Sequence, residues 1–415
     1  MLHSGTDWIG EIPVQWELAP TKRVFRGKKR IVGDEADNYE RLALTLNGVV
    51  KRNKDDNEGL QPEQFNGYQI LEKNELVFKL IDLQNIRTSR VGLSPYTGIV
   101  SPAYIILSNS ETDNRFYYYW FMDMYNRCIF NQMGDDGVRS ALNIKDVLEI
   151  PLPLIAESTR IKIASFLDKK CAEIDEMIAL QEKIVEELKA YKQSLITETV
   201  IKGLNPDAEM KDSGIEWIGE IPVHWKICKN RYLFKENVRK CNGTEISLSL
   251  SQADGLVPTA EMKENAMKSS SYENWKAVKV DDIVLNRFKA HLGVLFRAKL
   301  EGMVSFHYGV YEAITELYPQ YFEYLYHSDN YRYVYSIMSN GMVVGLQNLS
   351  NTNFYRVDCV VPTLEEQIQI SEYLDIKCTE IDNLISIKLS KIDSLKEYKK
   401  SIIYEYVTGK KEIIE

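Results

Sequence analysis

The sequence of 415 residues predicts a mixed α/β (α+β) fold, with two globular domains joined by two long antiparallel helices that form a coiled coil. Three observations predict this fold: a ten-residue motif that occurs twice, two long runs with coiled-coil spacing, and two dissimilar blocks of similar size. The chain is then one unit of about 207 residues written twice, and we expect internal pseudo-two-fold symmetry.

The ten-residue motif marks the start of each half. Asp7-Trp-Ile-Gly-Glu-Ile-Pro-Val-Gln-Trp16 returns 209 residues later as Glu216-Trp-Ile-Gly-Glu-Ile-Pro-Val-His-Trp225, with two substitutions. Residues 166–175 likewise recur as 373–382, and residues 98–104 as 302–308. Only two copies exist and each is as large as a domain, so the pattern indicates gene duplication and not a solenoid of short repeats.

Each half ends in a run that predicts one long helix. Between Glu157 and Lys202 apolar residues alternate at spacings of three and four, and the second run repeats this seam from Leu374 to Ile402. At about 1.5 Å per residue each helix is roughly 65 to 70 Å long, and its apolar stripe needs a partner. Because each helix ends a duplicated half, we expect the two to pair antiparallel. Gly203-Leu-Asn-Pro206 ends the first helix and links the halves.

Polar residues fall within both seams at matching heptad positions: Gln181 and Lys388, and Lys192 and Lys399. Two interpretations are open. A buried polar seam residue fixes the register at some cost in stability, or these long side chains extend to water. Cys171 and Cys378 also match, and small core residues are their simpler interpretation.

The blocks between the motif and the helix predict mixed α/β domains of about 130 residues. Apolar runs at Gln69–Leu83 and Ala277–Asn286 predict strands, and aromatic runs at Arg115–Ile129 and Gln320–Ile337 predict helices. Pro151, Pro153 and Pro362 mark the entries to the long helices. The predicted domains are therefore residues 1–150, 151–206, 207–358 and 359–415.

Composition narrows the class of protein. No apolar run approaches the roughly 20 residues that span a bilayer, and the N-terminus has no signal-peptide pattern, so we expect a cytoplasmic protein. Six cysteines and five histidines show no zinc spacing, which predicts reduced thiols and no metal site. The acidic excess lies outside the two blocks: residues 17–150 sum to −1 and residues 226–358 to +2, so the rest of the chain carries −10 of the net charge of −9.

Catalytic motifs are missing from the sequence. An adenine methyltransferase needs an Asn/Asp-Pro-Pro-aromatic motif with a Gly-rich loop, and an ATP-driven motor needs a P-loop; neither is present. Pro206-Asp-Ala-Glu-Met-Lys211 only faintly resembles a nuclease motif, because one residue between the carboxylates is too few to place them on adjacent strands. We expect neither a catalytic site nor a bound cofactor in this chain.

Basic clusters follow both copies of the motif and predict contacts to phosphate groups. A solvated basic surface is the alternative. The first cluster is Lys22, Arg23, Arg26, Lys28, Lys29 and Arg30, and the second is Lys226, Lys229, Arg231, Lys235, Arg239 and Lys240.

A second pair of matched segments follows the strand-like runs and predicts contacts to base edges, because arginine suits guanine and asparagine suits adenine. Ordinary polar loops have similar composition, so that interpretation stays open. The candidates are Arg87, Ser89 and Arg90 in the first half, and Arg287, Lys289 and His291 in the second. Arg139 is a weaker candidate without a counterpart.

These features together resemble the specificity subunit of type I restriction-modification enzymes, over essentially the whole chain. The resemblance is carried by the Trp-Ile-Gly-x-Ile-Pro-x-x-Trp edges, by Pro362-Thr-Leu-Glu-Glu-Gln367 at a helix entry, and by Val407-Thr-Gly-Lys410 at the close. The first copy departs from the last two, with Glu157-Ser-Thr-Arg160 and Val200-Ile-Lys-Gly203. Those departures put identical partner contacts at the two helix starts in doubt.

The resemblance implies a non-catalytic subunit whose two domains each read half of a split, asymmetric site in double-stranded DNA. It implies two methyltransferase subunits as partners, with restriction subunits joining them, so that S-adenosylmethionine and ATP with Mg²⁺ bind the partners only. A stand-alone DNA-binding regulator, or a coiled-coil adaptor that does not bind DNA, is the alternative function.

Overall fold

The computed structural model divides into two units, each containing part of both long helices. Unit 1 is Met1–Gln181 with Ser390–Glu415, and unit 2 is Glu182–Leu389. The four predicted domains, with their three boundaries, remain predictions, since this division runs through the helices and not at their ends. Within the described part of the chain, no helix is both long and apolar enough to cross a membrane. The structure describes residues 1–54, 64–81, 83, 90–133, 141–252, 254–262, 274–339 and 347–413.

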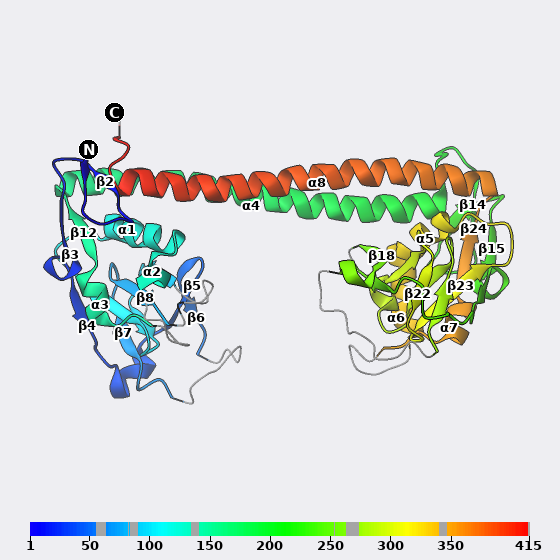
Figure 1. The fold of residues 1–415 in the computed structure, drawn as a ribbon, viewed down its shortest axis with the longest axis horizontal. Helices are drawn as coiled ribbons and strands as arrows, with labels where there is room; N and C mark the ends of the chain where they lie inside the picture. Colours follow the sequence, from blue (N-terminus) through cyan, green and yellow to red (C-terminus); the bar gives the residue numbers. More distant parts are fainter. Residues whose placement is uncertain are drawn as a thin grey trace. The chain divides into compact units, whose positions relative to one another are not determined.

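Both long helices form as predicted. Helix α4 spans Glu157–Lys202 and α8 spans Leu364–Val407, and Gly203 ends α4 with a φ of 80°. Within each unit the two helices lie side by side (Figure 1). They run in opposite directions, because Phe166 packs on Tyr406 at 4.4 Å between ring centroids while Asp175, further along α4, meets the earlier Lys399 on α8.

Two of the four polar seam residues, Lys192 and Lys399, form matched ion pairs between the helices, whereas Gln181 and Lys388 are half-buried. In unit 1 the Lys399 ammonium lies 2.6 Å from Asp175, and in unit 2 Lys192 lies 2.6 Å from Asp382. Both lysine side chains keep under a third of their surface exposed, at 29% and 28%. Each interpretation of these lysines, a buried seam residue or a side chain that extends to water, is therefore partly right. The lysines lie at the edge of the seam and bind the opposite helix. A pair at this point favours the observed register.

Unit 1 contains two four-stranded sheets, with orders β6-β5-β10-β7 and β4-β11-β8-β9, and the pairs β1-β2 and β12-β3. Only β5 and β10, of the pairs named here, run parallel. The strands are β1 (Leu2–His3), β2 (Glu11–Ile12), β3 (Glu17–Pro20), β4 (Arg26–Lys28), β5 (Arg41–Thr45), β6 (Gly48–Arg52), β7 (Gln69–Leu71), β8 (Leu76–Lys79), β9 (Arg90–Leu93), β10 (Gly98–Val100), β11 (Ile105–Ser108) and β12 (Pro151–Leu154).

Unit 2 repeats this topology. Its four-stranded sheet, β16-β23-β20-β21, matches β4-β11-β8-β9, and β15-β24 matches β3-β12. A bridge between Ser247 and Met303 joins β17-β18 to β19-β22, in the order of the other sheet of unit 1. The strands are β13 (Met210–Asp212), β14 (Glu220–Pro222), β15 (Lys226–Lys229), β16 (Phe234–Glu236), β17 (Leu248–Ser251), β18 (Gly255–Pro258), β19 (Lys276–Val278), β20 (Ile283–Asn286), β21 (Leu295–Arg297), β22 (Gly302–Val304), β23 (Tyr308–Ala313) and β24 (Asp358–Val361).

The runs predicted to form strands do so. Each run forms two strands in different sheets, β7 and β8 in unit 1 and β19 and β20 in unit 2. The chain reverses at Asn74 and Asp281, which have φ values of 68° and 71°. Asparagine and aspartate tolerate this left-handed backbone better than other residues, so the matched reversals follow from turn chemistry that the hydrophobic pattern obscured.

Each aromatic run that predicted a helix likewise forms two helices. Ser328, with an extended backbone, separates two helices in unit 2, and Cys128, with a φ of 58°, separates two in unit 1. The α-helices besides the long pair are α1 (Arg115–Asn126), α2 (Ile129–Met133), α3 (Ile144–Glu149), α5 (Pro319–His327), α6 (Asp329–Met338) and α7 (Asn351–Arg356). Short 3₁₀ helices cover Thr21–Arg23, Gly33–Asn38, Asn230–Tyr232, Thr259–Glu261 and Ala290–Leu292.

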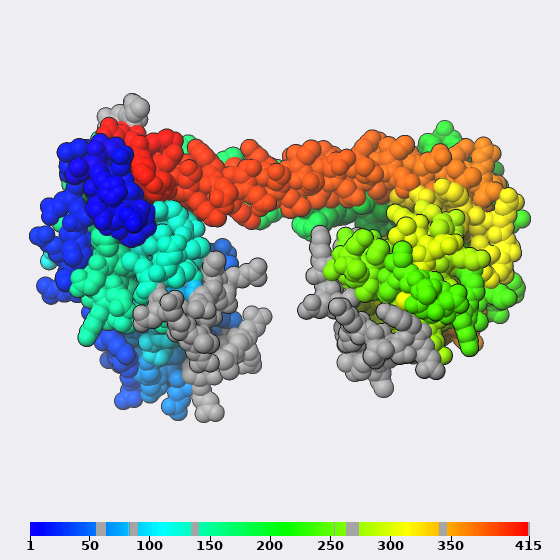
Figure 2. Space-filling view, viewed as in Figure 1, coloured from blue at the N-terminus to red at the C-terminus, as the bar shows by residue number. Residues whose placement is uncertain are grey.

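The duplicated motif closes the end of a long helix in each unit. In unit 1 the N-terminal segment lies against the end of α8 (Figure 2), where a side chain on Gly409 would overlap Pro13 and Trp16. In unit 2 Gly203, just past α4, lies against Trp225. Both glycines have positive φ, so a larger residue is strained at either position, and at Gly409 it would also overlap its neighbours.

The helix starts explain the departures between the two copies. In unit 2 Glu366 accepts hydrogen bonds from the backbone of Thr363 and from the indole of Trp225, and Gln367 accepts from the backbone of Tyr318. In unit 1 Arg160 takes the place of Gln367 and donates to the Tyr117 hydroxyl at 2.6 Å. The Glu-Gln pair thus makes contacts within the chain, and Arg160 makes an alternative contact to the same region of the domain.

Candidate nucleic-acid interface

The first basic cluster lies on the 3₁₀ helix Thr21–Arg23, on β4 and on the residues that follow. Lys22 and Arg23 form exposed ion pairs with Glu149 at 2.6 Å and Glu17 at 3.6 Å. Exposed pairs contribute little to stability and exchange readily with water and salt. These two cations therefore remain available to phosphate groups.

Lys28 is held inside unit 1. Its ammonium donates to Glu72 and Glu75, both at 2.8 Å, and the Glu75 side chain is only 5% exposed. Burial acts to lower the pKa of Lys28, but the hydrogen bonds to these carboxylates outweigh it and raise that pKa. Arg30 also binds Glu72, at 2.7 Å. Two of the six cations of the first cluster, Lys28 and Arg30, thus bind carboxylates of the same unit.

Unit 2 repeats this neutralisation. Arg239 binds the buried Asp282 and lies 3.5 Å from Glu312. Asp282 accepts the backbone N–H of Lys279 as Glu75 accepts that of Glu72, so the two acids occupy equivalent turns. Lys229 pairs with Asp358 at 3.2 Å. Part of each basic cluster, which the sequence suggests is a phosphate footprint, therefore binds carboxylates of its own unit.

Other predicted cations are exposed, and within the described part of the chain they form no ion pair. Arg231 lies over the Tyr232 ring, 5.8 Å from its centroid. This set is Arg26, Lys29, Lys226, Arg231, Lys235, Lys240 and Lys289. Because no carboxylate in the described ranges holds them, these residues are the better candidates for phosphate contacts.

The second pair of matched segments is only partly described. Arg87, Ser89 and Arg139 lie outside the described residues, and Arg90 begins β9. In unit 2 Arg287 follows β20. Lys289 directly precedes the 3₁₀ helix Ala290–Leu292, and His291 lies within that helix. Lys289 is exposed and His291 is half-buried.

Arg287 is anchored by a carboxylate. Glu236, whose side chain is 18% exposed, accepts from Arg287 at 2.7 Å, from Lys276 at 2.9 Å and from Asn351 at 2.7 Å. Three donors on one carboxylate fix the start of the Asn286–His291 segment. Arg287 thus orients that segment, and its direct contact with a base remains a prediction.

Arg41 and Arg52 were not among the cations that the sequence singled out. They lie directly opposite each other on β5 and β6, so their side chains share one face of the sheet. The signal that could have found them was a short hairpin, Arg41 to Arg52, with arginine at both ends and Leu46-Asn-Gly48 at the turn.

Each domain is fastened to its long helices by a matched tyrosine and aspartate. The Tyr119 hydroxyl donates to Asp168 at 2.8 Å in unit 1, and Tyr324 donates to Asp375 at 2.6 Å in unit 2. Arg115 adds an ion pair to Asp168 at 2.6 Å. Burial, above all, raises the pKa of both tyrosines, so they remain donors at every physiological pH.

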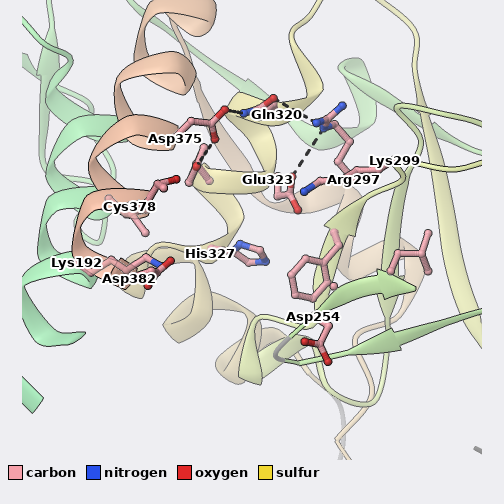
Figure 3. A pocket seen from close by; sticks show the side chains of 16 residues that line it. Lys192, Asp254, Arg297, Lys299, Gln320, Glu323, His327, Asp375, Cys378 and Asp382 are labelled. Carbon is pink, nitrogen blue, oxygen red and sulfur yellow. Dashed lines mark hydrogen bonds and ion pairs between the residues drawn. The ribbon is translucent and has the colours of Figure 1, made fainter. Parts of the chain in front are cut away.

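In unit 2 a polar cavity of about 460 Å³ lies beside this junction (Figure 3). Gln320 connects Asp375, at 2.5 Å, with Arg297, at 3.3 Å. Glu323 lies 3.9 Å from Arg297, and burial raises the pKa of Glu323 to about 7. Burial lowers the pKa of His327 to about 4.

These two groups give unit 2 opposing responses to pH. Folded Glu323 keeps its proton to about pH 7, against 4.5 ordinarily, so stability falls as pH rises between those values. Folded His327 stays neutral down to about pH 4, against 6.5 ordinarily, so stability falls as pH drops through that range. Arg297, Lys299 and Asp375 act on Glu323 as well.

Glu323→Gln should therefore remove this dependence on pH. Between pH 5 and pH 8 the unfolding free energy of the variant should fall by about 1 to 3 kcal/mol less than that of the native chain. His327→Gln is the matched control and should remove the opposite slope between pH 4 and 6.5. Urea unfolding followed at pH 5, 6.5 and 8 measures both. Parallel curves for Glu323→Gln and the native chain would contradict the assignment.

Lys28 and its neighbour Lys29 give a second test. Lys28→Ala leaves Glu75 buried without its cation, so we expect a loss of about 1 to 3 kcal/mol in unfolding free energy. Lys29→Ala, at an exposed position, should leave stability within about 0.5 kcal/mol and weaken DNA binding with a shallower salt dependence. Denaturant unfolding and salt-titrated binding separate the two. A stable Lys28→Ala protein that loses DNA affinity would restore Lys28 as a phosphate contact.

The fold is similar to that of solved structures, although no protein-family profile matches the sequence. A chain from a structure on complex assembly and conformational transition of the type I R-M system aligns over 96% of this chain and 98% of its own, with 14% identity and a TM-score of 0.68. The crystal structure of the HsdS subunit from Thermoanaerobacter tengcongensis aligns over 98% and 100%, with 14% identity and a TM-score of 0.52. The chain therefore has the fold of the specificity subunit of type I restriction-modification systems.

Proposed function

We propose that this chain is the DNA sequence-recognition subunit of a type I restriction-modification complex. It binds a bipartite, asymmetric site in double-stranded DNA and docks methyltransferase and restriction subunits. The observation that carries this proposal is that the two halves attach their domains to the long helices in the same way, while the domains themselves differ. The Tyr119–Asp168 and Tyr324–Asp375 junctions match, while the domains that they fasten differ in sequence.

Two different DNA-binding domains, held by one pair of long helices, suit a recognition site that is divided into two parts. Each domain presents exposed cations that no described carboxylate holds, Arg26 and Lys29 in unit 1 and Lys235, Lys240 and Lys289 in unit 2. Cations of this kind supply affinity for the DNA backbone, and differing side chains elsewhere supply the choice of bases. An asymmetric site follows because the two domains are not identical.

The long helices offer matched apolar positions to protein partners. On α4, Met177 and Leu180 are 44% and 55% exposed; on α8, their repeat equivalents Leu384 and Ile387 are 46% and 63% exposed. Exposed apolar pairs at i and i+3 on a helix mark an interaction surface. Their duplication supports two copies of one partner, which we identify as the methyltransferase subunit.

We assign the chemistry to the partners. The sequence lacks methyltransferase and P-loop motifs, so S-adenosylmethionine and ATP with Mg²⁺ are expected on the partner subunits. The chain contributes binding and placement of the DNA.

Co-expression with its methyltransferase subunit, followed by mapping of methylated adenines, tests the proposal. We expect two fixed half-sites separated by a gap of constant length. Tight sequence-specific binding by the chain without any methyltransferase would favour a stand-alone regulator. A coiled-coil adaptor would show no salt-dependent DNA binding at all.

A further inference from the structure

A tight turn between β22 and β23 carries two exposed aromatic side chains in unit 2. The N–H of Tyr308 donates to the carbonyl of Ser305 at 3.0 Å, which places Phe306 and His307 at the two central positions of a β-turn. Both side chains are exposed, that of Phe306 at 51%. Their ring centroids lie 3.9 Å apart. The two rings therefore stand together at a corner of the domain.

Phe288 extends this pair to a cluster of three rings. It follows β20, which is the neighbour of β23 in the sheet, and it is 42% exposed. Its ring centroid lies 6.1 Å from that of His307. A group of exposed rings in mutual contact indicates a surface that binds a ligand. We call Phe288, Phe306 and His307 the aromatic cluster.

One carboxylate fixes both segments that carry the aromatic cluster. Glu236 accepts from Arg287, the residue before Phe288, at 2.7 Å and from Lys276 at 2.9 Å. The Lys276 ammonium also donates to the carbonyl of Tyr308, directly after the turn, at 2.9 Å. The backbone that holds the rings is thus already ordered, so a ligand that contacts them causes little further loss of conformational entropy.

The same turn occurs in unit 1 with different side chains. Residues 98–104 correspond to 302–308, and the N–H of Tyr104 donates to the carbonyl three residues before it, at 3.1 Å. The central residues of this turn are Pro102 and Ala103, both exposed. The backbone of the turn is therefore shared by the two units, while its two projecting side chains are not.

Phe288 likewise has a counterpart without a ring, Ile81. The N–H of Leu349 donates to the carbonyl directly before Phe288, at 2.9 Å. One repeat length earlier, the N–H of Leu142 donates to the carbonyl directly before Ile81, at 3.0 Å. At these three matched positions, only unit 2 has aromatic rings.

This difference favours DNA over a protein partner as the ligand. A partner that binds both halves meets matched residues, such as the exposed apolar positions of the long helices, whereas the two halves of an asymmetric DNA site meet unlike ones. Lys289, next to Phe288, is exposed, and among the described residues no carboxylate pairs with it. A cation beside exposed rings suits a base together with its phosphate group.

An aromatic side chain interacts with a base through its flat face, and in a duplex the neighbouring bases cover that face. Proteins gain access by inserting apolar side chains between two base pairs, which unstacks the step and kinks the duplex. Stacking of a base on an aromatic ring then offsets the stacking that is lost, and it does so for every base. Steps that unstack easily are favoured, so such a wedge reads the deformability of the sequence.

We propose that Phe288, Phe306 and His307 form a wedge that opens one base step in the half-site of unit 2 and stacks on the base that is uncovered. This inference rests on the proposed function and names residues that act within it. Unit 2 then selects its half-site partly by the ease with which one step opens.

Phe306→Ala tests the wedge in the full chain with its methyltransferase partner. Binding to the native site should weaken about 5- to 100-fold. One step of the unit 2 half-site, open in the native complex, should lose its reactivity toward permanganate, which attacks unstacked thymine, and chloroacetaldehyde, which attacks unpaired adenine and cytosine. Phe306→Tyr keeps a ring and should keep that reactivity. Tyr333→Ala is the matched control, because Tyr333 is an exposed aromatic residue of unit 2, at 61%, outside the aromatic cluster.

The reactions are run at saturating protein, so that weaker binding does not hide an open step. The adenine that a methyltransferase turns out of the duplex is a separate reactive position and serves as an internal reference in every variant. Unfolding midpoints show which variants are folded. If Phe306→Ala does not fold, Phe288→Ala gives the same test at the neighbouring ring.

A native complex in which only the target adenine reacts would overturn the proposal, and so would an open step that persists in Phe306→Ala. Weaker binding of Phe306→Ala to the methyltransferase subunit without DNA would also overturn it, in favour of a protein interface. If the native complex shows no sequence-specific methylation, the proposed function itself fails, which is a separate result.

Discussion

Removing one heptad from each long helix is expected to shorten the gap between the two half-sites by about three base pairs. Deleting Ile178–Ile184 together with Ile385–Lys391 removes seven residues from α4 and from α8 and keeps the seam in phase. Seven residues at about 1.5 Å shorten each helix by roughly 10 Å. At about 3.4 Å per base pair this equals roughly three base pairs of DNA.

The same change should abolish recognition of the native site. Three base pairs also turn one half-site by about 100° around the duplex, at roughly 10 to 10.5 base pairs per turn. A rigid protein then meets only one half-site in the correct orientation. The retained pairs, Asp175 with Lys399 and Lys192 with Asp382, lie outside the deleted segments and should hold the register in the variant.

Methylation mapping decides this prediction. We expect any new site to contain the native half-sites with a shorter gap. Lys183→Ala with Ser386→Ala is the matched control, since both exposed residues lie in the deleted heptads and the helix length is kept. An unchanged site with an unchanged gap, at near-native affinity, would show that the helices do not set the spacing.

Replacing residues 17–150 with the equivalent block of a relative is expected to change one half-site and leave the other intact. The reason is that the domain of unit 1 meets its long helices at a defined junction, a hydrophobic core that joins α1 to α4 and α8 together with a few polar contacts. Strand β3 pairs with β12 beyond the end of the block, and Arg115 and Tyr119 bind Asp168. A donor block that retains these positions should dock as the native block does.

The reciprocal exchange of residues 226–358 is the control and should change only the other half-site. Mapping methylated adenines for both chimaeras, beside the native chain, gives the result directly. If both half-sites change in either chimaera, the two domains do not read independently. A folded chimaera in which neither half-site changes would place base recognition outside the exchanged block.

Regular spacing of apolar residues predicted the elements whose structure depends on such spacing. The spacing of apolar residues placed the first long helix at Glu157–Lys202, as observed, because a heptad seam fixes helix phase over many turns. The same reasoning treated Gln69–Leu83 and Gln320–Ile337 as undivided runs, although polar residues mark the breaks between β7 and β8, at Glu72-Lys-Asn-Glu75, and between α5 and α6, at Ser328-Asp-Asn330. Such clusters of polar residues are turn signals.

The candidate interface shows what the sequence could not supply. Six cations within nine residues indicate nucleic-acid binding, yet Lys28 is bound by Glu75, 47 residues away, and Arg239 by Asp282, 43 residues away. Conversely, Arg41 and Arg52 are eleven residues apart and face each other only because the chain turns between them.

By itself the sequence determined the duplication, the two long helices and the position of the variable blocks, since each is written in repeated residues or in a regular period along the chain. Only the tertiary structure decided which of the predicted cations bind carboxylates of their own unit, as Lys28 and Arg239 do. Ion pairing depends on distances of a few ångströms between side chains, and those distances are set by strand register and turns that bring remote residues together.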